Sequence, residues 1–472
     1  MEFLVDMAVW LFRVLFRQST ARTAAAAFAC AILVGTVLLT LPAGSRQGRW
    51  TAPVDALFTA TSAVCVTGLI VKSTPQHWSH FGQVVILTLI QMGGLGIMTV
   101  SASVAIMLPR RLMRRFEAVV GELVEAGPLE SVWTLIGFIC LFAFVAEAAG
   151  AAVLFVAWRA NFPDAGQCLY HSVFHAISAF CNAGFSLNDN NLEAYVDSIS
   201  VNAVVCTLIV IGGLGFTVVR DLVHYGHWWL LVRRGKKPRL STHTKLVLTV
   251  TGVLLLVGFV GILVIESHAS LSGAPWKTRL LASMFQSVTP RTAGFNTIRM
   301  DPKVLAPATT LLLMALMYVG GSPGGTAGGI KTSTLGVMIA SIIAILKGRS
   351  RAELFHHSVP EAVVHRVLSI ILLSLTALAG AVFLLLMTES ASLQRGVITV
   401  QEVAFDAVSA FGTVGLSLGL ATPDGPVTTA GKLILTALMF VGRLGPITLA
   451  LSIAWARERA AYQYPEEQVL VG

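Results

Sequence analysis

The sequence predicts an all-α integral membrane protein built from four similar repeats. The chain has 472 residues, of which 55% are hydrophobic and only 12% charged, whereas soluble domains carry about 25% charged residues. Apolar runs of roughly 20 residues recur along the chain, and each is long enough to cross the bilayer. Single glycines followed by Leu or Phe recur at positions 68, 184, 294 and 415. Their spacing of 116, 110 and 121 residues indicates an internal repeat.

Each repeat is predicted to contain a span, a short half-helix with a glycine loop, and a second span. In the first repeat, Thr20–Leu41 and Phe81–Leu108 are the two spans. Pro53–Val64 is too short to cross the bilayer, so we predict a re-entrant half-helix there. The chain then passes Gly68 as non-helical backbone, which the membrane interior tolerates only inside protein or along a watery cavity.

The other three repeats follow the same pattern. Their predicted spans are 133–158, 201–223, 245–266, 305–346, 366–387 and 431–456, and their half-helices are 170–180, 279–288 and 400–411. The chain is therefore divided into an N-terminal interfacial segment, four repeats and a tail, which are 1–19, 20–108, 131–223, 245–346, 366–456 and 457–472. This organisation predicts eight transmembrane helices and four re-entrant half-helices around one central pore.

Basic residues set the predicted orientation. Lys and Arg gather between the repeats, for example in 110–115 and 233–239. The positive-inside rule places this side and both termini in the cytoplasm, so the four glycine loops open outward. The net charge of +9 is explained by topology, and we expect no nucleic-acid partner. Docking of an acidic or nucleotide-bearing regulator is a second interpretation of the same loops.

The glycine loops are predicted to bind a cation through backbone carbonyls. Moving a bare ion into hydrocarbon is very costly, and a ring of carbonyls can replace its water. Glycine freely adopts positive φ, which lets successive carbonyls turn toward one axis. Each half-helix also directs the negative end of its dipole at the loop. The candidate segments are Val66-Thr67-Gly68, Asn182-Ala183-Gly184, Thr292-Ala293-Gly294 and Thr413-Val414-Gly415.

With these loops the chain resembles the Trk/Ktr/HKT superfamily of potassium transporters, especially the KtrB-type membrane subunit. The four loops carry the resemblance together with residues 174–180, 288–296, 409–415 and 441–446. The resemblance implies channel-like potassium uptake in a bacterial inner (plasma) membrane, with potassium held by the carbonyls of the four segments. Glycine in all four implies potassium selectivity, and one glycine per segment implies a short coordinating stack.

A glycine-rich stretch within 305–346 predicts a broken helix. The stretch Tyr318–Lys331 contains a proline and many glycines, which a regular helix does not accommodate, namely Gly320, Gly321, Gly324, Gly325, Gly328 and Gly329. By resemblance this loop, with Lys331, forms an intramembrane gate below the filter. A kinked span or a helix-packing motif of small residues is the alternative.

Arg443 is predicted to lie about half-way along the last span. A buried intramembrane charge is costly and usually functional, and by resemblance Arg443 faces the pore at the gate. The alternative is snorkelling to the cytoplasmic interface. Glu147, in the span 133–158, is interpreted as a hydrogen-bonded carboxylate, with a sodium or proton role as the alternative. Cys65 and Cys181 are interpreted as small packing residues rather than metal ligands.

The resemblance also implies partners. It predicts a homodimer and a cytosolic KtrA-like ring that carries the nucleotide, while this subunit holds no tightly bound cofactor. Whether sodium activates transport stays open. An alternating-access symporter is disfavoured because the four repeats run parallel, whereas inverted repeats are common in such transporters. A membrane-embedded enzyme is disfavoured because the charged groups within the spans, Glu147, Lys331 and Arg443, are scattered.

Overall fold

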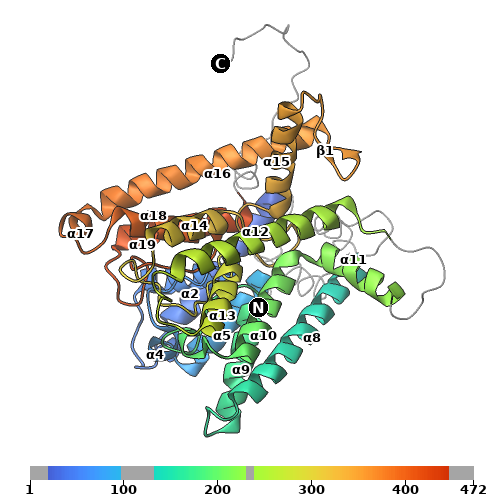
Figure 1. Cartoon of the computed structure of the whole chain (residues 1–472). Coiled ribbons are helices and arrows are strands. Elements are labelled where there is room, and N and C mark those ends of the chain that lie inside the picture. The colour runs from blue at the N-terminus through green and yellow to red at the C-terminus, as the bar shows by residue number, and fades with distance from the viewer. Residues whose placement is uncertain (1–19, 97–131, 230–238, 446–472) are drawn as a thin grey trace, which may run out of the picture.

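The computed structural model describes residues 20–96, 132–229 and 239–445, and the regular secondary structure of these residues is almost entirely helical (Figure 1). The all-α prediction needs one correction within these ranges. Strands β1 (Glu353–Leu354) and β2 (His357–Ser358) form a small antiparallel hairpin. Phe355 and His356 between them both have positive φ, 48° and 67°, which is the geometry of a tight two-residue hairpin turn.

The first two repeats each contain a helix that ends directly before the glycine segment. The first comprises α2 (Thr20–Thr40), η1 (Pro42–Gly44), α3 (Pro53–Val64), α4 (Thr74–His77) and α5 (His80–Gly94). The second comprises α8 (Val132–Trp158), α9 (Ala165–Phe180), η2 (Glu193–Tyr195), α10 (Ile199–Leu214) and α11 (Phe216–His227). The predicted half-helix in the first repeat has the same bounds as α3. Helix α9 begins before the predicted residue 170 because the Asp164 side chain caps it, accepting from the Gln167 amide at 2.8 Å.

The third and fourth repeats have the same order. The third comprises α12 (Thr242–Glu266), α13 (Trp276–Val288), α14 (Pro307–Tyr318) and α15 (Thr332–Leu346). The fourth comprises α16 (Glu361–Thr388), α17 (Ser390–Gln394), α18 (Val400–Gly412) and α19 (Thr429–Leu444). The predicted broken helix of 305–346 is confirmed, since the chain between α14 and α15 is a loop.

One predicted span needs correction. The interval 201–223 is not one continuous helix, because the helix breaks at Gly215, whose φ is 82°, and α10 and α11 differ in direction by 106°. Helix α19 ends at Leu444, before Gly445 with a φ of 83°. The remainder of the spans 81–108 and 431–456, the N-terminal segment, the tail and the basic residues of 110–115 and 233–237 lie outside the described residues.

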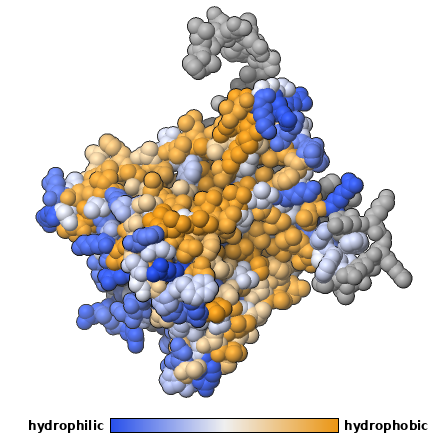
Figure 2. Space-filling model, viewed as in Figure 1, coloured by the Kyte–Doolittle hydropathy of each residue, from blue (hydrophilic) through white to orange (hydrophobic). Residues whose placement is uncertain are grey.

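The apolar surface is that of a membrane protein. Among the described residues, three helices are long and apolar enough to cross a bilayer, and the bent pair α10 and α11 makes a fourth if counted as one span. The three are Ile136–Trp158, Thr242–Glu266 and Glu361–Thr388. Apolar residues cover much of the face in Figure 2, and hydrophilic residues gather at its lower left and beside the hairpin at the upper right.

The repeats pack in a closed ring. The short helices are α3, α9, α13 and α18. Within their own repeats, α3, α9 and α18 each pack against two longer or equally long helices, and α13 packs against α12. The helix after each loop also packs on the short helix of the next repeat: α5 on α9, α10 on α13, α14 on α18, and α19 back on α3. Each short helix buries one phenylalanine almost completely, and these are Phe58, Phe174, Phe285 and Phe405. The four glycine loops are thereby brought to a common centre.

Candidate ion-binding site

The four glycine segments (66–68, 182–184, 292–294 and 413–415) meet one another in cyclic order. A side chain added to any of the four glycines would overlap the backbone of the next segment. The carbonyls that it would meet are those of Ala183 for Gly68, Ala293 for Gly184, Val414 for Gly294 and Thr67 for Gly415. The last contact returns to the first segment, so the ring is closed.

The four segments share an unusual backbone conformation. The glycines have φ of 91°, 69°, 75° and 96° in chain order. The residue two positions earlier is also left-handed in every segment, and these are Val66 (55°), Asn182 (60°), Thr292 (72°) and Thr413 (51°). Such a conformation costs a non-glycine residue about 1–3 kcal/mol, so the surrounding structure must hold it in place. Sequence reasoning placed positive φ only at the glycines, because Val, Asn and Thr give no such signal.

Amide N–H groups of the segments are bound by the short helices. In the fourth segment, the Val414 N–H donates to the Ser409 carbonyl at 2.8 Å and the Gly415 N–H donates to Ser409 Oγ at 3.1 Å. The first segment repeats this with Ser62 at 2.7 and 3.0 Å. Ala183 and Ala293 donate to the carbonyls of Ser178 and Thr289 at 2.7 and 2.9 Å. Because these donors are bound away from the ring, the carbonyls of the segments are the groups left to bind a ligand.

The side-chain hydroxyl that binds each segment is a signal in the sequence that the sequence analysis missed. A serine or threonine stands five or six residues before every segment glycine, at Ser62, Ser178, Thr289 and Ser409. Its hydroxyl binds backbone of the loop that follows, in the second repeat through Ser178 Oγ to the Phe185 carbonyl at 2.8 Å.

The loops that follow the four segments are also joined to one another. Lys72 Nζ lies 2.6 Å from Asp424 Oδ1 and joins the first loop to the fourth. This hydrogen bond lowers the pKa of Asp424. Gln76 Nε2 donates to Asp189 at 2.9 Å, and Asn296 Nδ2 donates to Glu193 at 2.8 Å. These contacts join the first, second and third loops in the order of the ring.

The loop between α14 and α15 lies against the ring of segments. Its two ends are paired, with the Gly320 N–H donating to the Ile330 carbonyl at 2.9 Å. Its middle is bound to α10, through Ser322 N–H to the Gly213 carbonyl at 2.9 Å and Thr326 N–H to the Gly212 carbonyl at 3.1 Å. Gly328 lies so close to Thr413 that a side chain there would overlap it. The loop therefore contacts both the ring and the neighbouring repeat.

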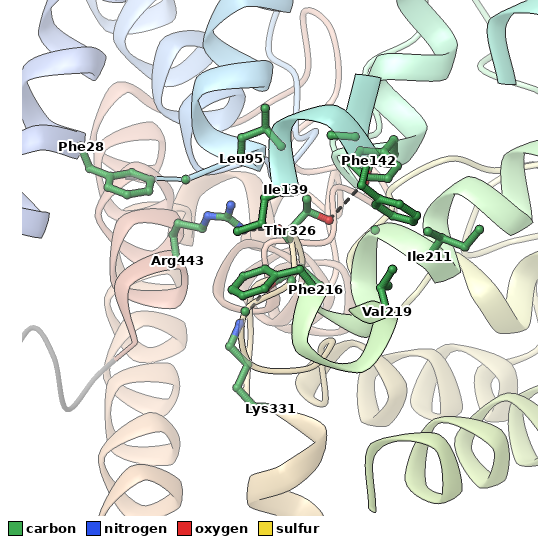
Figure 3. A pocket seen from close by; sticks show the side chains of 18 of the residues that line it. Phe28, Leu95, Ile139, Phe142, Ile211, Phe216, Val219, Thr326, Lys331 and Arg443 are labelled. Carbon is green, nitrogen blue, oxygen red and sulfur yellow. Dashed lines mark hydrogen bonds between the residues drawn. The ribbon is translucent and has the colours of Figure 1, made fainter. Parts of the chain in front are cut away.

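Arg443 and Lys331 point into one cavity beside this loop (Figure 3). The cavity has a volume of about 260 Å³ and is lined largely by apolar side chains, including Phe28, Phe142 and Phe216. The Arg443 guanidinium donates to the carbonyls of Thr326 and Gly93, and Lys331 Nζ donates to the Ala327 carbonyl at 2.7 Å. Within the described ranges, neither cation has a carboxylate partner.

Arg443 lies in the last turn of α19, which ends before Gly445. Its place half-way along the span 431–456 stays a prediction, because 446–456 lie outside the described residues. Its contacts reach into the molecule, across to α5 and the glycine-rich loop.

A second arginine, Arg291, was not singled out from the sequence. It directly precedes the third segment and is 7% exposed. Its Nη2 donates to the Gly320 carbonyl at 2.9 Å, at the start of the glycine-rich loop. Arg291 thus connects the third segment to that loop.

Glu147 is a buried, hydrogen-bonded carboxylate, as interpreted from the sequence. Gln91 Nε2 donates to its two oxygens at 3.0 and 3.1 Å. Cys181 lies beside this pair, with Sγ 3.5 Å from Gln91 Oε1. Cys65 and Cys181 are both buried free thiols. No group of three metal-ligating side chains is found in the described part of the chain.

Comparison with known proteins decides the family. The family model TrkH, described as a cation transport protein, matches residues 12–463. The chain belongs to this family. It is accordingly a multi-pass membrane transporter and not an enzyme.

Individual relatives agree with this assignment. The chain is 40% identical to the potassium/sodium uptake protein NtpJ of Enterococcus hirae, over 99% of this chain and all of that one. It is 36% identical to the Ktr system potassium uptake protein B of Bacillus subtilis, over 94% and 95% of the two chains. The crystal structure of the potassium transporter TrkH from Vibrio parahaemolyticus has the same fold, with a TM-score of 0.68 and 19% sequence identity. The match covers 91% of the present chain and 84% of the TrkH chain.

Proposed function

We propose that the chain is the ion-conducting subunit of a Ktr-type potassium uptake system. The observation that carries this proposal is the closed ring of four glycine segments whose amide donors are bound by the short helices. A ring of carbonyls replaces the water of a potassium ion. The carboxyl ends of α3, α9, α13 and α18 adjoin the ring, and their dipoles favour a cation.

In this proposal the four segments are the selectivity filter, and potassium passes through their carbonyls. The loop 319–331, with Lys331 and Arg443, is the gate. The repeats supply eight spans and four re-entrant helices around the pore, in the bacterial inner membrane with both termini cytoplasmic. The positive charges of Lys331 and Arg443 repel a permeating cation, and movement of the loop relieves this electrostatic barrier.

The names of the relatives support proposals about the partner subunits and about the transported ions. A Ktr-system relative implies partner subunits, and we propose a homodimer regulated by a cytosolic KtrA-like ring that holds the nucleotide. No tightly bound cofactor is proposed for this chain. The relative named as a potassium/sodium uptake protein supports sodium as a second ion or an activator.

The proposal is tested by rubidium uptake. The purified protein in liposomes with an inward rubidium gradient is expected to take up ⁸⁶Rb⁺, and external potassium should compete better than sodium. Uptake should increase when a KtrA-like ring is added. If the protein is inserted in the membrane but takes up no ⁸⁶Rb⁺, either alone or with the KtrA-like ring, the proposed function is contradicted.

Replacing Ser409 by alanine should weaken selectivity. The change leaves the partly buried Gly415 N–H without its side-chain partner, and an unpaired buried donor costs about 1–3 kcal/mol. We expect the preference for potassium over sodium to fall by about tenfold, since 1.4 kcal/mol corresponds to a factor of ten. The control is Ser369→Ala on α16, where the hydroxyl binds only its own helix. Equal ion preference in the two variants would show that Ser409 does not support the filter.

A further inference from the structure

The inner end of the ring is surrounded by the carboxyl ends of broken helices. In all four repeats the helix after the glycine loop stops at this level: α5 at Gly94, α10 at Leu214, α14 at Tyr318 and α19 at Leu444. The last carbonyls of a helix have no helical partner and carry partial negative charge. The unpaired carbonyls of four such helix ends around one axis favour the binding of hydrogen-bond donors or of a cation.

A short glycine motif produces this arrangement. The pairs Gly93-Gly94, Gly212-Gly213, Gly320-Gly321 and Gly442-Arg443 occupy corresponding places in the four repeats. In three of them the first glycine lies against the last carbonyls of a short helix, so close that a side chain would overlap, and these contacts are Gly93 with Val64, Gly212 with Phe180 and Gly442 with Phe411. Carbonyl oxygens from two sets of helices therefore gather beneath the ring.

Different donors occupy these oxygens. The carbonyls of Gly212 and Gly213 accept from the glycine-rich loop, and that of Gly320 accepts from Arg291. The carbonyl of Gly93 accepts from Arg443, whose guanidinium also donates to the Thr326 carbonyl. In the part of the chain that the structure describes, Arg443 is compensated by carbonyl dipoles and by no carboxylate. Carbonyl dipoles alone also stabilise a dehydrated potassium ion.

We propose that the carbonyls of Gly93 and Thr326 belong to a second monovalent-cation site just inside the filter, which the Arg443 guanidinium fills in this state. The inference rests on the proposed potassium pathway and adds to it. Arg443 is a tethered substitute for a permeating ion, in addition to repelling one. When its side chain leaves, the site accepts a potassium ion on its way from the filter.

The direct test is anomalous diffraction from Tl⁺, a potassium substitute, in crystals of Arg443→Ala and of the unmodified protein. A peak between the Gly93 and Thr326 carbonyls is expected in the variant and absent in the unmodified protein. Arg443→Lys, which keeps a charge, should show no peak, and Arg443→Met is a second neutral variant of nearly matched length if the alanine variant does not fold. Peaks in the ring without one at these oxygens in a neutral variant would overturn the second site, whereas no peaks in the ring would count against the proposed function itself.

A flux measurement gives an independent readout. Guanidinium ion added to Arg443→Ala liposomes should restore the missing group and inhibit ⁸⁶Rb⁺ flux at a concentration about tenfold lower than in the unmodified protein, because in the unmodified protein the tethered Arg443 side chain competes for the same carbonyls. Urea, which has a similar shape and no charge, should not inhibit. Equal sensitivity of the two proteins to guanidinium would contradict the site.

Discussion

Replacing Gly294 by alanine is expected to abolish potassium-selective uptake. Gly294 has a φ of 75°, and an added methyl group would overlap the Val414 carbonyl of the next segment. The backbone conformation costs an alanine about 1–2 kcal/mol, but the larger effect is the overlap. Backbone is the obstacle, so no side-chain rotation relieves it. The Val414 carbonyl must move, and it is one of the groups proposed to hold the ion.

The measurement is ⁸⁶Rb⁺ uptake in liposomes, with and without competing sodium. Gly348→Ala is the matched control, since Gly348 has a φ of 63° and nothing within 4 Å of the added methyl group. Both variants should show similar backbone strain, but only Gly294→Ala should lose uptake or potassium preference by about tenfold or more, as expected from a loss above 1.4 kcal/mol. If Gly294→Ala keeps the rate and ion preference of the Gly348 variant, the filter assignment is wrong.

Much of the local structure could be predicted from the sequence, because the lengths of the apolar runs and the positions of proline and glycine determine it. Pro53 begins α3, and the run that follows is too short to cross a bilayer, so both bounds of that helix were predicted. The glycine-rich stretch after Tyr318 ended α14 for the same kind of local reason. The repeat spacing predicted a common axis, and the cyclic packing of the four short helices agrees with it.

Other features depend on contacts between distant residues. Gly215 looks like an ordinary glycine of a membrane helix, where glycine is common. The helix nevertheless breaks there, and the Phe216 N–H donates instead to the carbonyl of Gly324, in another repeat, at 3.3 Å.

Some of these features did have a signal in the sequence. A Gly-Gly or Gly-Arg pair recurs in the second span of each repeat, beginning at residues 93, 212, 320 and 442. Comparing the repeats beyond their filters predicts that the helices after the four loops end at corresponding positions. It also shows that Arg443 stands where the other repeats have glycine, which singles it out as the asymmetric element.

Shortening the glycine-rich loop is expected to give the largest effect in the opposite direction. Deleting residues 322–328 joins Gly321 to Gly329, and the pairing of Gly320 with Ile330 at 2.9 Å keeps the two ends together. The deletion removes the bonds from Ser322 and Thr326 to α10 and takes away one of the acceptors of Arg443. These are the contacts that hold the loop across the inner end of the ring. Rubidium flux without any regulatory subunit should therefore rise by about tenfold or more, the effect of removing a closed-state preference above 1.4 kcal/mol.

The selectivity of this flux distinguishes a gate from other roles of the loop. The segment hydrogen bonds to Ser62, Ser178, Thr289 and Ser409 are untouched by the deletion, so potassium should still be preferred over sodium. Adding Gly294→Ala to the shortened protein should remove that preference, which would show that the ions pass through the ring. An alternating-access transporter would instead lose transport, because the loop would be part of the element that moves. Unchanged or reduced flux in the shortened, membrane-inserted protein would therefore count against the gate and in favour of a moving-repeat mechanism.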